Sequence, residues 1–213
     1  PVADARRVCA ELGAPHYVVN VERQFKRAIV DHFVDSYLMG KTPNPCVRCN
    51  QYIKFGVLWQ HAQALGATML ATGHYARTER DPETGHVHLL RGVDRKKDQS
   101  YALSKVGQEP LAHSIFPLGE LTKEQTRARA VECHIDIAAK PESQELCFVT
   151  HDDYRAFLRR QRPDTPADGL IKREDGVVVG SHTGVTDYTV GQRKGLGIAA
   201  ALPVFVTRLD AST

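Results

Sequence analysis

The sequence has no apolar run long enough to cross a membrane and no signal peptide. It also has little excess of either charge, since 28 Lys and Arg residues against 25 Asp and Glu residues leave a formal net charge of +3. This balance does not by itself indicate a polyanionic partner. Because 42% of the 213 residues are hydrophobic, the chain can form one large domain, or one domain with a smaller appendage.

The five cysteines are an odd number, and without a signal peptide they indicate a reducing compartment. We therefore expect a cytoplasmic protein, or one of an organellar matrix if the source is eukaryotic. In such a compartment cysteines are more often reactive or buried than paired in structural disulfides.

A second pair of metal ligands is also missing. Cys46 and Cys49 have the C-x-x-C spacing of half a zinc site, but such a site normally needs a further Cys/Cys or His/His pair. The other cysteines stand singly, and His86 and His88 belong to a predicted hairpin. We expect a reactive thiol and no structural metal. The alternatives are a zinc site, a thioredoxin-type redox pair that opens a helix after a strand, and two buried core cysteines.

The segment TPNPCVRCNQYIKF (42–55) combines these cysteines with rigid backbone. Pro43 and Pro45 restrict their own φ angles and the conformations of the residues before them, so we expect a stiff, non-helical loop that carries the first cysteine. Arg48 and Lys54 are nearby cations. They would lower the pKa of a thiol in this loop and favour the nucleophilic thiolate.

Helix and strand patterns alternate along the first part of the chain. Apolar residues at helical spacing predict helices over residues 2–12, 22–40 and 55–65, each ending at a glycine. Short apolar runs predict strands over residues 16–21 and 68–72. This alternation predicts an α/β fold with a parallel sheet covered by helices.

Gly73 and His74 directly follow the second predicted strand. In open α/β sheets the ligand crevice lies at the carboxyl ends of the strands, where a glycine lets the backbone approach a nucleotide closely. We therefore expect both residues at a binding crevice. A turn glycine and a surface histidine are the alternative.

Turn residues at 80–85 predict a hairpin between strands at 74–78 and 86–91. The run that follows leads into a short helix and combines a cation, a carboxylate, an amide and a hydroxyl, which suits contacts to RNA sugars and phosphates. A plain helix start capped by Asp98 is the alternative. The four residues of this run are Lys97, Asp98, Gln99 and Ser100.

Basic residues form three separate groups. Charge runs are usually solvated faces, but separated groups could also line a path for a phosphate backbone. The groups are Arg91 with Arg95, Lys96 and Lys97; Arg155 with Arg159, Arg160 and Arg162; and Arg193 with Lys194.

Cys147 stands between a polar run and the apolar residues Phe148 and Val149. This position fits a thiol where a mobile loop meets a strand, and a buried core cysteine is the alternative. Cys147 is far from Cys49 in the sequence, so only the fold can bring the two together.

The pattern changes beyond residue 150. A capping box at 122–125 predicts one helix before this point, and a short basic helix is predicted over 152–162 after it. The segment 162–168 is a predicted domain boundary. Short β runs then predict a small β-rich second domain, with strands over 169–172, 177–179, 188–190 and 204–209.

Six segments together resemble one family, the tRNA-specific 2-thiouridylases of the MnmA/TrmU type. They occur in the family's order along the whole chain, which makes the resemblance specific although no single segment is decisive. The segments are NPCVRCN with IKF (44–55), ATGHYAR (71–77), LLRGVDRKKDQSY (89–101), FPLGELTK (116–123), ELCFV (145–149) and GQRKGLGI (191–198).

The resemblance implies a partial adenine-nucleotide α-hydrolase-like catalytic domain over residues 1–150, a small β-rich central domain over 151–202 and the start of a C-terminal β-barrel over 203–213. It implies a tRNA-uridine 2-sulfurtransferase that uses ATP, with Mg²⁺, to adenylate the wobble uridine (position 34) of tRNAs for Lys, Glu and Gln. Sulfur from a persulfide then replaces the oxygen on carbon 2. A cysteine desulfurase or a sulfur relay protein would supply the sulfur, and no membrane is involved.

The resemblance also assigns residues. Cys49 would be the catalytic cysteine, Cys147 would carry the persulfide, and a disulfide bond is implied. The other assignments are Gly73 for ATP; Asn44, Pro45 and Cys46 for the target base; and His74, Lys97, Asp98 and Gln99 for tRNA.

Two features depart from the family pattern. Many members have Asp where this chain has Cys46, so the acid–base role given to that Asp lacks its usual residue here. No Ser-Gly-Gly-x-Asp-Ser phosphate loop occurs in the sequence. Because the sequence also starts within a helical pattern, we expect an internal fragment that binds ATP poorly and is inactive alone, with the loop upstream and most of the barrel downstream.

Other functions remain open on these residues. A non-catalytic RNA-binding fragment would use the basic groups alone. Another ATP-dependent thiolase or ligase of the same superfamily would share the fold but modify a different substrate, and a zinc-stabilised domain would contain metal.

Overall fold

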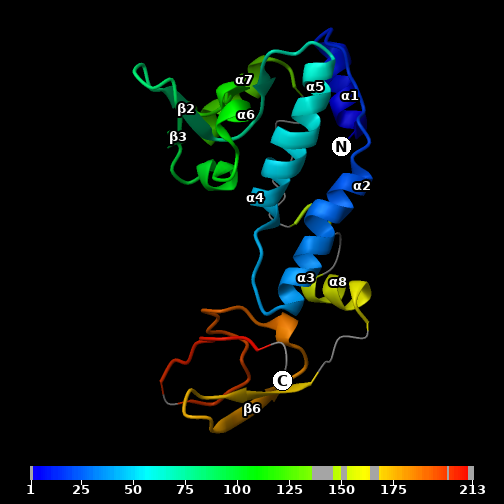
Figure 1. Cartoon of the computed structure of the whole chain (residues 1–213). Helices are drawn as coiled ribbons and strands as arrows, with labels where there is room; N and C mark the ends of the chain where they lie inside the picture. Colours follow the sequence, from blue (N-terminus) through cyan, green and yellow to red (C-terminus); the bar gives the residue numbers. More distant parts are fainter. Residues whose placement is uncertain (1, 136–145, 150–152, 164–167, 201, 211–213) are drawn as a thin grey trace. The chain divides into compact units, whose positions relative to one another are not determined.

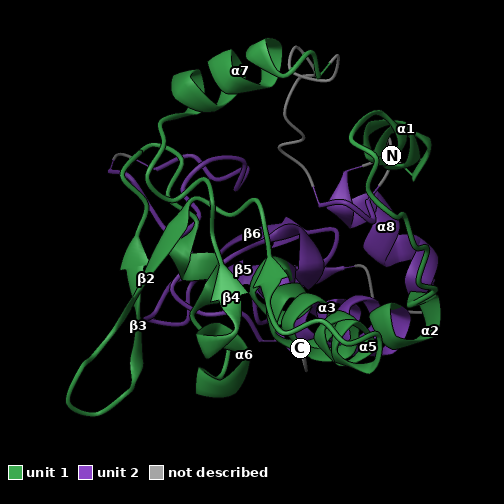
Figure 2. Cartoon of the chain, turned by 90° about the horizontal axis from the view of Figure 1, so that it is seen from above, with its two compact units in different colours: residues 1–25, 46–143 green, residues 26–45, 144–213 purple. Residues whose placement is uncertain are grey.

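The computed structural model describes residues 2–135, 146–149, 153–163, 168–200 and 202–210. The chain forms two compact units (Figure 2). Each unit has its own hydrophobic core. Unit 1 comprises residues 1–25 and 46–143, and unit 2 comprises residues 26–45 and 144–213. Each unit is therefore built from two separate parts of the sequence.

Unit 1 begins with the predicted helix, α1 (Val2–Glu11), which is followed by Gly13 in the left-handed region at a φ of 64°. The strand predicted over residues 16–21 is wrong. These residues have no regular structure, and Tyr17 and Val18 are exposed. A strand needs a neighbour for its backbone hydrogen bonds, and none of the described strands pairs with this segment.

A helical segment over residues 45–64, the cysteine helix, carries both cysteines of the C-x-x-C pair (Figure 1). It comprises α4 (Pro45–Cys49), the wider π-helical turns of η2 (Asn50–Leu58) and α5 (Trp59–Ala64). The irregular backbone predicted before Cys46 is present at residues 41–44, but the prediction that Cys46 itself lies on this loop is wrong, since the helix begins at Pro45. Proline is well tolerated in the first turn of a helix, because its missing N–H has no partner there in any case.

The sheets of unit 1 have two strands each. The strand β1 (Leu70–Ala71) pairs in parallel with β4 (Ser114–Ile115). The strands β2 (Ala76–Arg80) and β3 (Val87–Arg91) form the predicted antiparallel hairpin. The parallel pair places the residues that follow β1 at the carboxyl end of both strands.

The core of unit 1 holds the cysteine helix against the hairpin. The 3₁₀ helix η3 (Ser100–Leu103) and α6 (Gln108–Ala112) both contact β3 and η2. The buried residues that join these elements are Phe55, Ala76, Val87, Leu103, Leu111 and Phe116.

The helix α7 (Lys123–Glu132) starts with the predicted capping box. The Thr122 hydroxyl accepts a hydrogen bond from the backbone N–H of Gln125 at 3.2 Å, and the Gln125 side chain accepts one from the backbone N–H of Thr122 at 2.8 Å. The capping box thereby satisfies two of the backbone donors at this helix end.

The helix predicted over residues 22–40 is present, and it comprises α2 (Glu22–Phe25), η1 (Lys26–Asp31) and α3 (His32–Leu38). Gly40 follows it in the left-handed region at a φ of 68°. The last two of these elements belong to unit 2.

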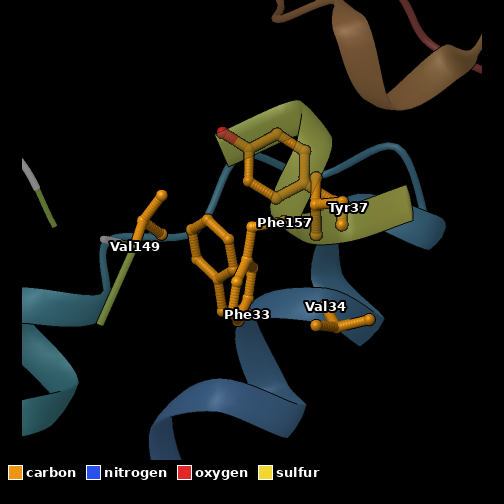
Figure 3. Packing of buried hydrophobic residues seen from close by; sticks show 6 residues of the cluster. Phe33, Val34, Tyr37, Val149 and Phe157 are labelled. Atoms are coloured by element: carbon orange, nitrogen blue, oxygen red, sulfur yellow. The ribbon is translucent and has the colours of Figure 1, made fainter. Parts of the chain in front are cut away.

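The core of unit 2 lies between α3 and α8 (Tyr154–Gln161), which is the predicted basic helix. Figure 3 shows Phe33, Val34 and Tyr37 of α3 packed with Val149 and Phe157. The Phe33 and Tyr37 rings meet edge to face, with centroids 5.0 Å apart.

The strands β5 (Gly169–Lys172) and β6 (Val178–His182) pair in antiparallel fashion, as the β runs predicted, and the 3₁₀ helix η5 (Val185–Asp187) follows them. The strands predicted at 188–190 and 204–209 are wrong, since no regular strand is present at either place. In the part of the chain that the structure describes, the backbone of Val206 forms one hydrogen bond with Gly191 and one with Gln192, and two hydrogen bonds do not make a strand ladder.

Candidate functional site

The C-x-x-C thiols lie on the first turns of the cysteine helix. Cys46 is exposed and Cys49 is half-buried. Helical residues three apart are neighbours, with Cβ atoms about 5–6 Å apart, so both thiols lie on one side of the helix. The pair opens a helix as a thioredoxin-type pair would, but it follows the irregular residues 41–44 and no strand. A ligand that approaches this side of the helix can reach both sulfur atoms.

A pocket of about 540 Å³ opens at the carboxyl end of β1. The crevice predicted at this position is therefore present, and Gly73 and His74 line it as predicted. The cysteine helix and the segment after β3 complete its wall. The lining residues are Lys54, Leu58, Leu70, Ala71, Thr72, Gly73, His74 and Gln99.

Gly73 leaves the backbone open to this pocket. A Cβ atom at this position would have Leu118 as its nearest neighbour, at 3.7 Å, so packing within the protein does not require a glycine. The missing side chain instead leaves room for a ligand to approach the main chain.

His74 lies on the pocket wall but is itself buried, so the surface-histidine alternative is wrong. Its ring lies 6.2 Å from the rings of both Phe55 and Phe116, centroid to centroid, and its Nδ1 is 2.8 Å from the Thr72 hydroxyl. Burial, with a smaller effect from the positive charge of Lys54, lowers the pKa of His74 to about 4. At pH 7 the ring is therefore neutral and can act as a hydrogen-bonding group.

The carboxylate of Asp98 holds the loop that precedes η3. It accepts hydrogen bonds from the backbone N–H of Gly92 at 2.9 Å and from the N–H and hydroxyl of Ser100 at 3.3 and 3.1 Å. Burial acts to raise the pKa of Asp98, but these hydrogen bonds outweigh it and hold the pKa below its usual value. Asp98 is not the N-cap of η3, since Gln99 occupies that position and no side chain caps the helix, so its carboxylate instead ties Gly92 to Ser100.

Gln99 joins the same loop to the hairpin and lines the pocket. Its backbone N–H donates to the Tyr75 carbonyl at 2.9 Å, and its Oε1 accepts from the Tyr75 N–H at 3.2 Å. The Tyr75 N–H is a donor and needs an acceptor, so the side-chain amide of Gln99 must turn its oxygen towards it. The Nε2 group of Gln99 then presents its N–H donors elsewhere.

Asn50, the residue after Cys49, ties the cysteine helix to η3. It is 2% exposed, and its Nδ2 donates to the Ala102 carbonyl at 3.0 Å. Among the residues that the structure describes, its Oδ1 is the one buried side-chain polar atom without a hydrogen-bond partner. Sequence analysis missed this residue, because nothing in the sequence indicates that its amide contacts a segment that comes 52 positions later.

From the sequence, Lys54 was expected only to lower the pKa of the nearby thiols. In the structure its charge acts on His74 and its side chain lines the pocket, together with Leu58 one turn further along the helix. The sequence shows that Lys54 and Leu58 are four residues apart. It does not show that both residues line the pocket at the end of β1.

Lys97, a predicted tRNA contact, is half-buried in unit 1. The other predicted residues, Asn44, Pro45 and Cys147, belong to unit 2. Asn44 is exposed and Pro45 is buried. Cys147 is an exposed thiol, so the alternative of a buried core cysteine is wrong. The neighbouring residues Phe148 and Val149 instead pack in the core of unit 2, which leaves the sulfur outside. Cys49 and Cys147 are thus accessible to different degrees and lie in different units.

The predicted basic groups differ in their contacts. Arg155 and Arg159 of the second group both form ion pairs with Asp187, at 3.8 and 3.4 Å. These two arginines help to hold α8 to η5 within unit 2. Arg95 and Lys96 of the first group and Arg193 and Lys194 of the third are exposed, so these two groups are better candidates for contacts to phosphate.

Within the described ranges, no helix is long and apolar enough to span a membrane. In the same residues, no three His, Cys, Asp or Glu side chains gather closely enough to hold a metal ion.

Two family models match the chain. The first, described as a tRNA methyl transferase HUP domain, matches residues 1–151, and the second, described as a tRNA methyl transferase PRC-barrel domain, matches residues 155–213. The class is therefore a nucleotide α-hydrolase-like HUP domain followed by a small barrel domain, which confirms the predicted fold class.

The named relatives identify the family within this class. Proteins named tRNA-specific 2-thiouridylase MnmA from Heliobacterium modesticaldum and Geotalea uraniireducens are 49% and 51% identical to this chain over 210 and 211 residues. These alignments cover 98% and 99% of the chain, and 54% and 56% of the relatives, so the chain spans about half the length of the curated relatives it matches. The chain belongs to the tRNA-specific 2-thiouridylase family, as the six ordered segments predicted.

Proposed function

We propose that this chain forms part of the catalytic core of an enzyme that transfers persulfide sulfur to carbon 2 of the wobble uridine of tRNA, with use of ATP. The observation that carries this proposal is that the helix with Cys49 also supplies Lys54 and Leu58 to the wall of the pocket at the end of β1. One helix thus links a thiol to a crevice of the kind that binds nucleotides in α/β proteins.

The HUP domain fits the use of ATP, and the pocket offers suitable contacts. Gly73 would let the nucleotide approach the main chain, and Lys54 would provide positive charge near its phosphates, with Mg²⁺ as the accompanying ion. When bound, ATP supplies the group that turns the oxygen on carbon 2 into a good leaving group. His74 remains neutral there and so adds no further charge.

The two cysteines would then carry the sulfur. The outer sulfur of a persulfide on Cys147 forms a bond to carbon 2, and the activated oxygen leaves. The thiolate of Cys49 attacks the sulfur of Cys147, so that the persulfide S–S bond breaks and its electrons stay with the sulfur on the base. A disulfide between Cys49 and Cys147 remains, and a cellular thiol must reduce it before the next turnover.

The tRNA contacts follow the loop that precedes η3. Lys97 and Gln99 would contact the RNA directly, His74 would do so through the pocket, and Asp98 would contribute by holding the loop in place. The target base would meet the start of the cysteine helix, at Asn44, Pro45 and Cys46. The proposed substrates are tRNAs for Lys, Glu and Gln, and the proposed sulfur source is a cysteine desulfurase or a sulfur relay protein.

The test is nucleoside mass spectrometry of tRNA from cells that lack their own enzyme. The full-length gene that contains this chain should restore 2-thiouridine, whereas its Cys49→Ser and Cys147→Ser variants should not. Cys133→Ser is the matched control, because Cys133 is also an exposed thiol but has no proposed role. Restoration by both active-site variants would refute the sulfur chemistry, and a methylated uridine would point to methyl transfer instead.

A further inference from the structure

The cysteine helix carries three aromatic residues, and only one of them is outside the core. Phe55 and Trp59 are each 3% exposed, whereas Tyr52 is 42% exposed. A ring of this size that does not contribute to a core leaves a large flat apolar surface in contact with water. Tyr52 lies three positions after Cys49, so the two side chains are neighbours on the helix.

A cation is already stacked on this ring. The guanidinium carbon of Arg48 lies 4.7 Å from the centroid of Tyr52. The two residues are four apart, and Cys49 lies between them in the sequence, so one stretch of the helix carries both this stacked cation and ring and the thiol. An aromatic ring combined with arginine is the surface on which unpaired RNA bases stack.

The proposed reaction creates a need for such a surface. The target uridine must leave the base stack of the anticodon loop to reach a thiol, and this exposes a face of each neighbouring base. A protein side chain that takes over the lost stacking would offset part of the unstacking cost. The ring of Tyr52 is exposed and lies within one helical turn of Cys49.

We propose that Tyr52, with Arg48 stacked on it, is the platform on which a base next to the target uridine stacks while the uridine occupies the site at Cys49. This inference rests on the proposed function. Tyr52 is then a binding residue for the anticodon loop, and it touches no reacting atom.

Binding measurements with altered RNA test this platform directly. Substrate tRNA is compared with two versions that carry a single abasic nucleotide, one immediately 5′ and one immediately 3′ of the target uridine. Fluorescence anisotropy with the full-length wild-type protein should show about tenfold or weaker binding for one of the two abasic RNAs. The RNA that loses affinity identifies the base that stacks.

The protein variants complete a double-mutant cycle. Tyr52→Ala should bind intact tRNA about tenfold more weakly and should no longer distinguish it from that abasic RNA. Tyr52→Phe keeps the ring and should bind like wild type. The matched control is Tyr17→Ala, since Tyr17 is another exposed tyrosine of unit 1, 68% exposed. It should also bind like wild type.

Two further readouts separate stacking from other effects. Stacking carries no net charge, so Tyr52→Ala should leave the salt dependence of binding unchanged, whereas Lys96→Gln should reduce it. Tyr52→Ala should raise the KM for tRNA and leave kcat close to wild type. A helix that Tyr52→Ala merely unfolds would instead lower kcat and change the circular dichroism spectrum, and this result would overturn the proposal.

The platform is also overturned if wild type binds all three RNAs equally, or if Tyr52→Ala still discriminates between them as wild type does. These failures are distinct from failure of the proposed function. The latter would appear as a wild-type protein that forms no 2-thiouridine on intact tRNA, whatever its preference among the abasic RNAs.

Discussion

The neutral state of His74 leads to a quantitative prediction about stability and pH. The folded pKa is about 4, against 6.5 for an unperturbed histidine. As the pH falls below 6.5 the unfolded chain takes up a proton at His74, and the folded chain does not until about pH 4. The unfolded state is therefore favoured progressively as the pH falls through this window, and this part of the stability is regained as the pH rises from about 4 to 6.5 and is fully present above 6.5.

The magnitude follows from the size of the shift. Each pH unit between the two pKa values is worth about 1.4 kcal/mol. Over the window from 6.5 to about 4, the free energy of unfolding should therefore fall by about 3 kcal/mol because of His74 alone. This is a large part of the total stability of an ordinary domain, which is about 5–15 kcal/mol.

The matched variant is His74→Gln, whose amide can still bond to the Thr72 hydroxyl but does not titrate in this range. The difference in unfolding free energy between wild type and variant should change by about 3 kcal/mol between pH 7 and pH 4, with wild type losing more. All other histidines are common to both proteins, so their effects cancel.

Trp59 provides the signal for this assay, because it is the one tryptophan of the sequence and is buried in unit 1. Urea unfolding followed by its fluorescence gives the free energies. The ring of His113 stacks on it with centroids 5.6 Å apart, so the midpoint of the transition should be used instead of the intensity. NMR of ring-labelled histidine gives the pKa independently. A difference that stays constant with pH, or a His74 resonance that titrates near 6.5, would refute the reasoning.

Three further predictions concern local contacts. Lys54→Met should raise the pKa of His74 only part of the way back towards 6.5, because burial is the larger cause of the shift and the Lys54 charge the smaller. The same NMR titration measures this change. Gly119→Ala should destabilise unit 1 by about 3 kcal/mol in urea unfolding, since its Cβ would overlap the Ala76 carbonyl oxygen. Gly107→Ala should cost far less, because its Cβ would make only an ordinary contact with Pro110 Cδ at 3.9 Å. Thr122→Ala should cost about 1 kcal/mol by the same assay, because it removes the capping box of α7, and no loss would show that the cap does not support the helix.

The sequence predicted those features of the fold that depend on neighbouring residues. The helix over residues 22–38 has its apolar positions one turn apart, the hairpin at 76–91 has turn residues between its strands, and the cap at Thr122 needs only a partner three residues later. The predicted strands at 16–21 and 204–209 failed for the opposite reason. A strand exists only if another segment pairs with it, and the residues of the strand do not reveal whether that partner is present.

The candidate site also contains features that the sequence predicted and features that it did not. Gly73 and His74 could be placed at a crevice because the end of a parallel strand is a general binding position, and the pocket is found there. The helical start at Pro45 was missed, because a proline in the first turn of a helix and a proline in a loop restrict φ equally. The role of Asp98 was left open between an RNA contact and a cap, and only its hydrogen bonds to Gly92 and Ser100 show what the carboxylate holds.

The sequence by itself determined the family and the position of the crevice, because ordered motifs and local periodicity are properties of residues close together in the chain. Only the tertiary structure decided that Asn50 bonds to Ala102, that His74 is buried and neutral, and that Tyr52 remains outside the core. These features depend on which distant segments pack against a residue. Burial and hydrogen-bond partners arise from that packing, so they become visible only once the chain has folded.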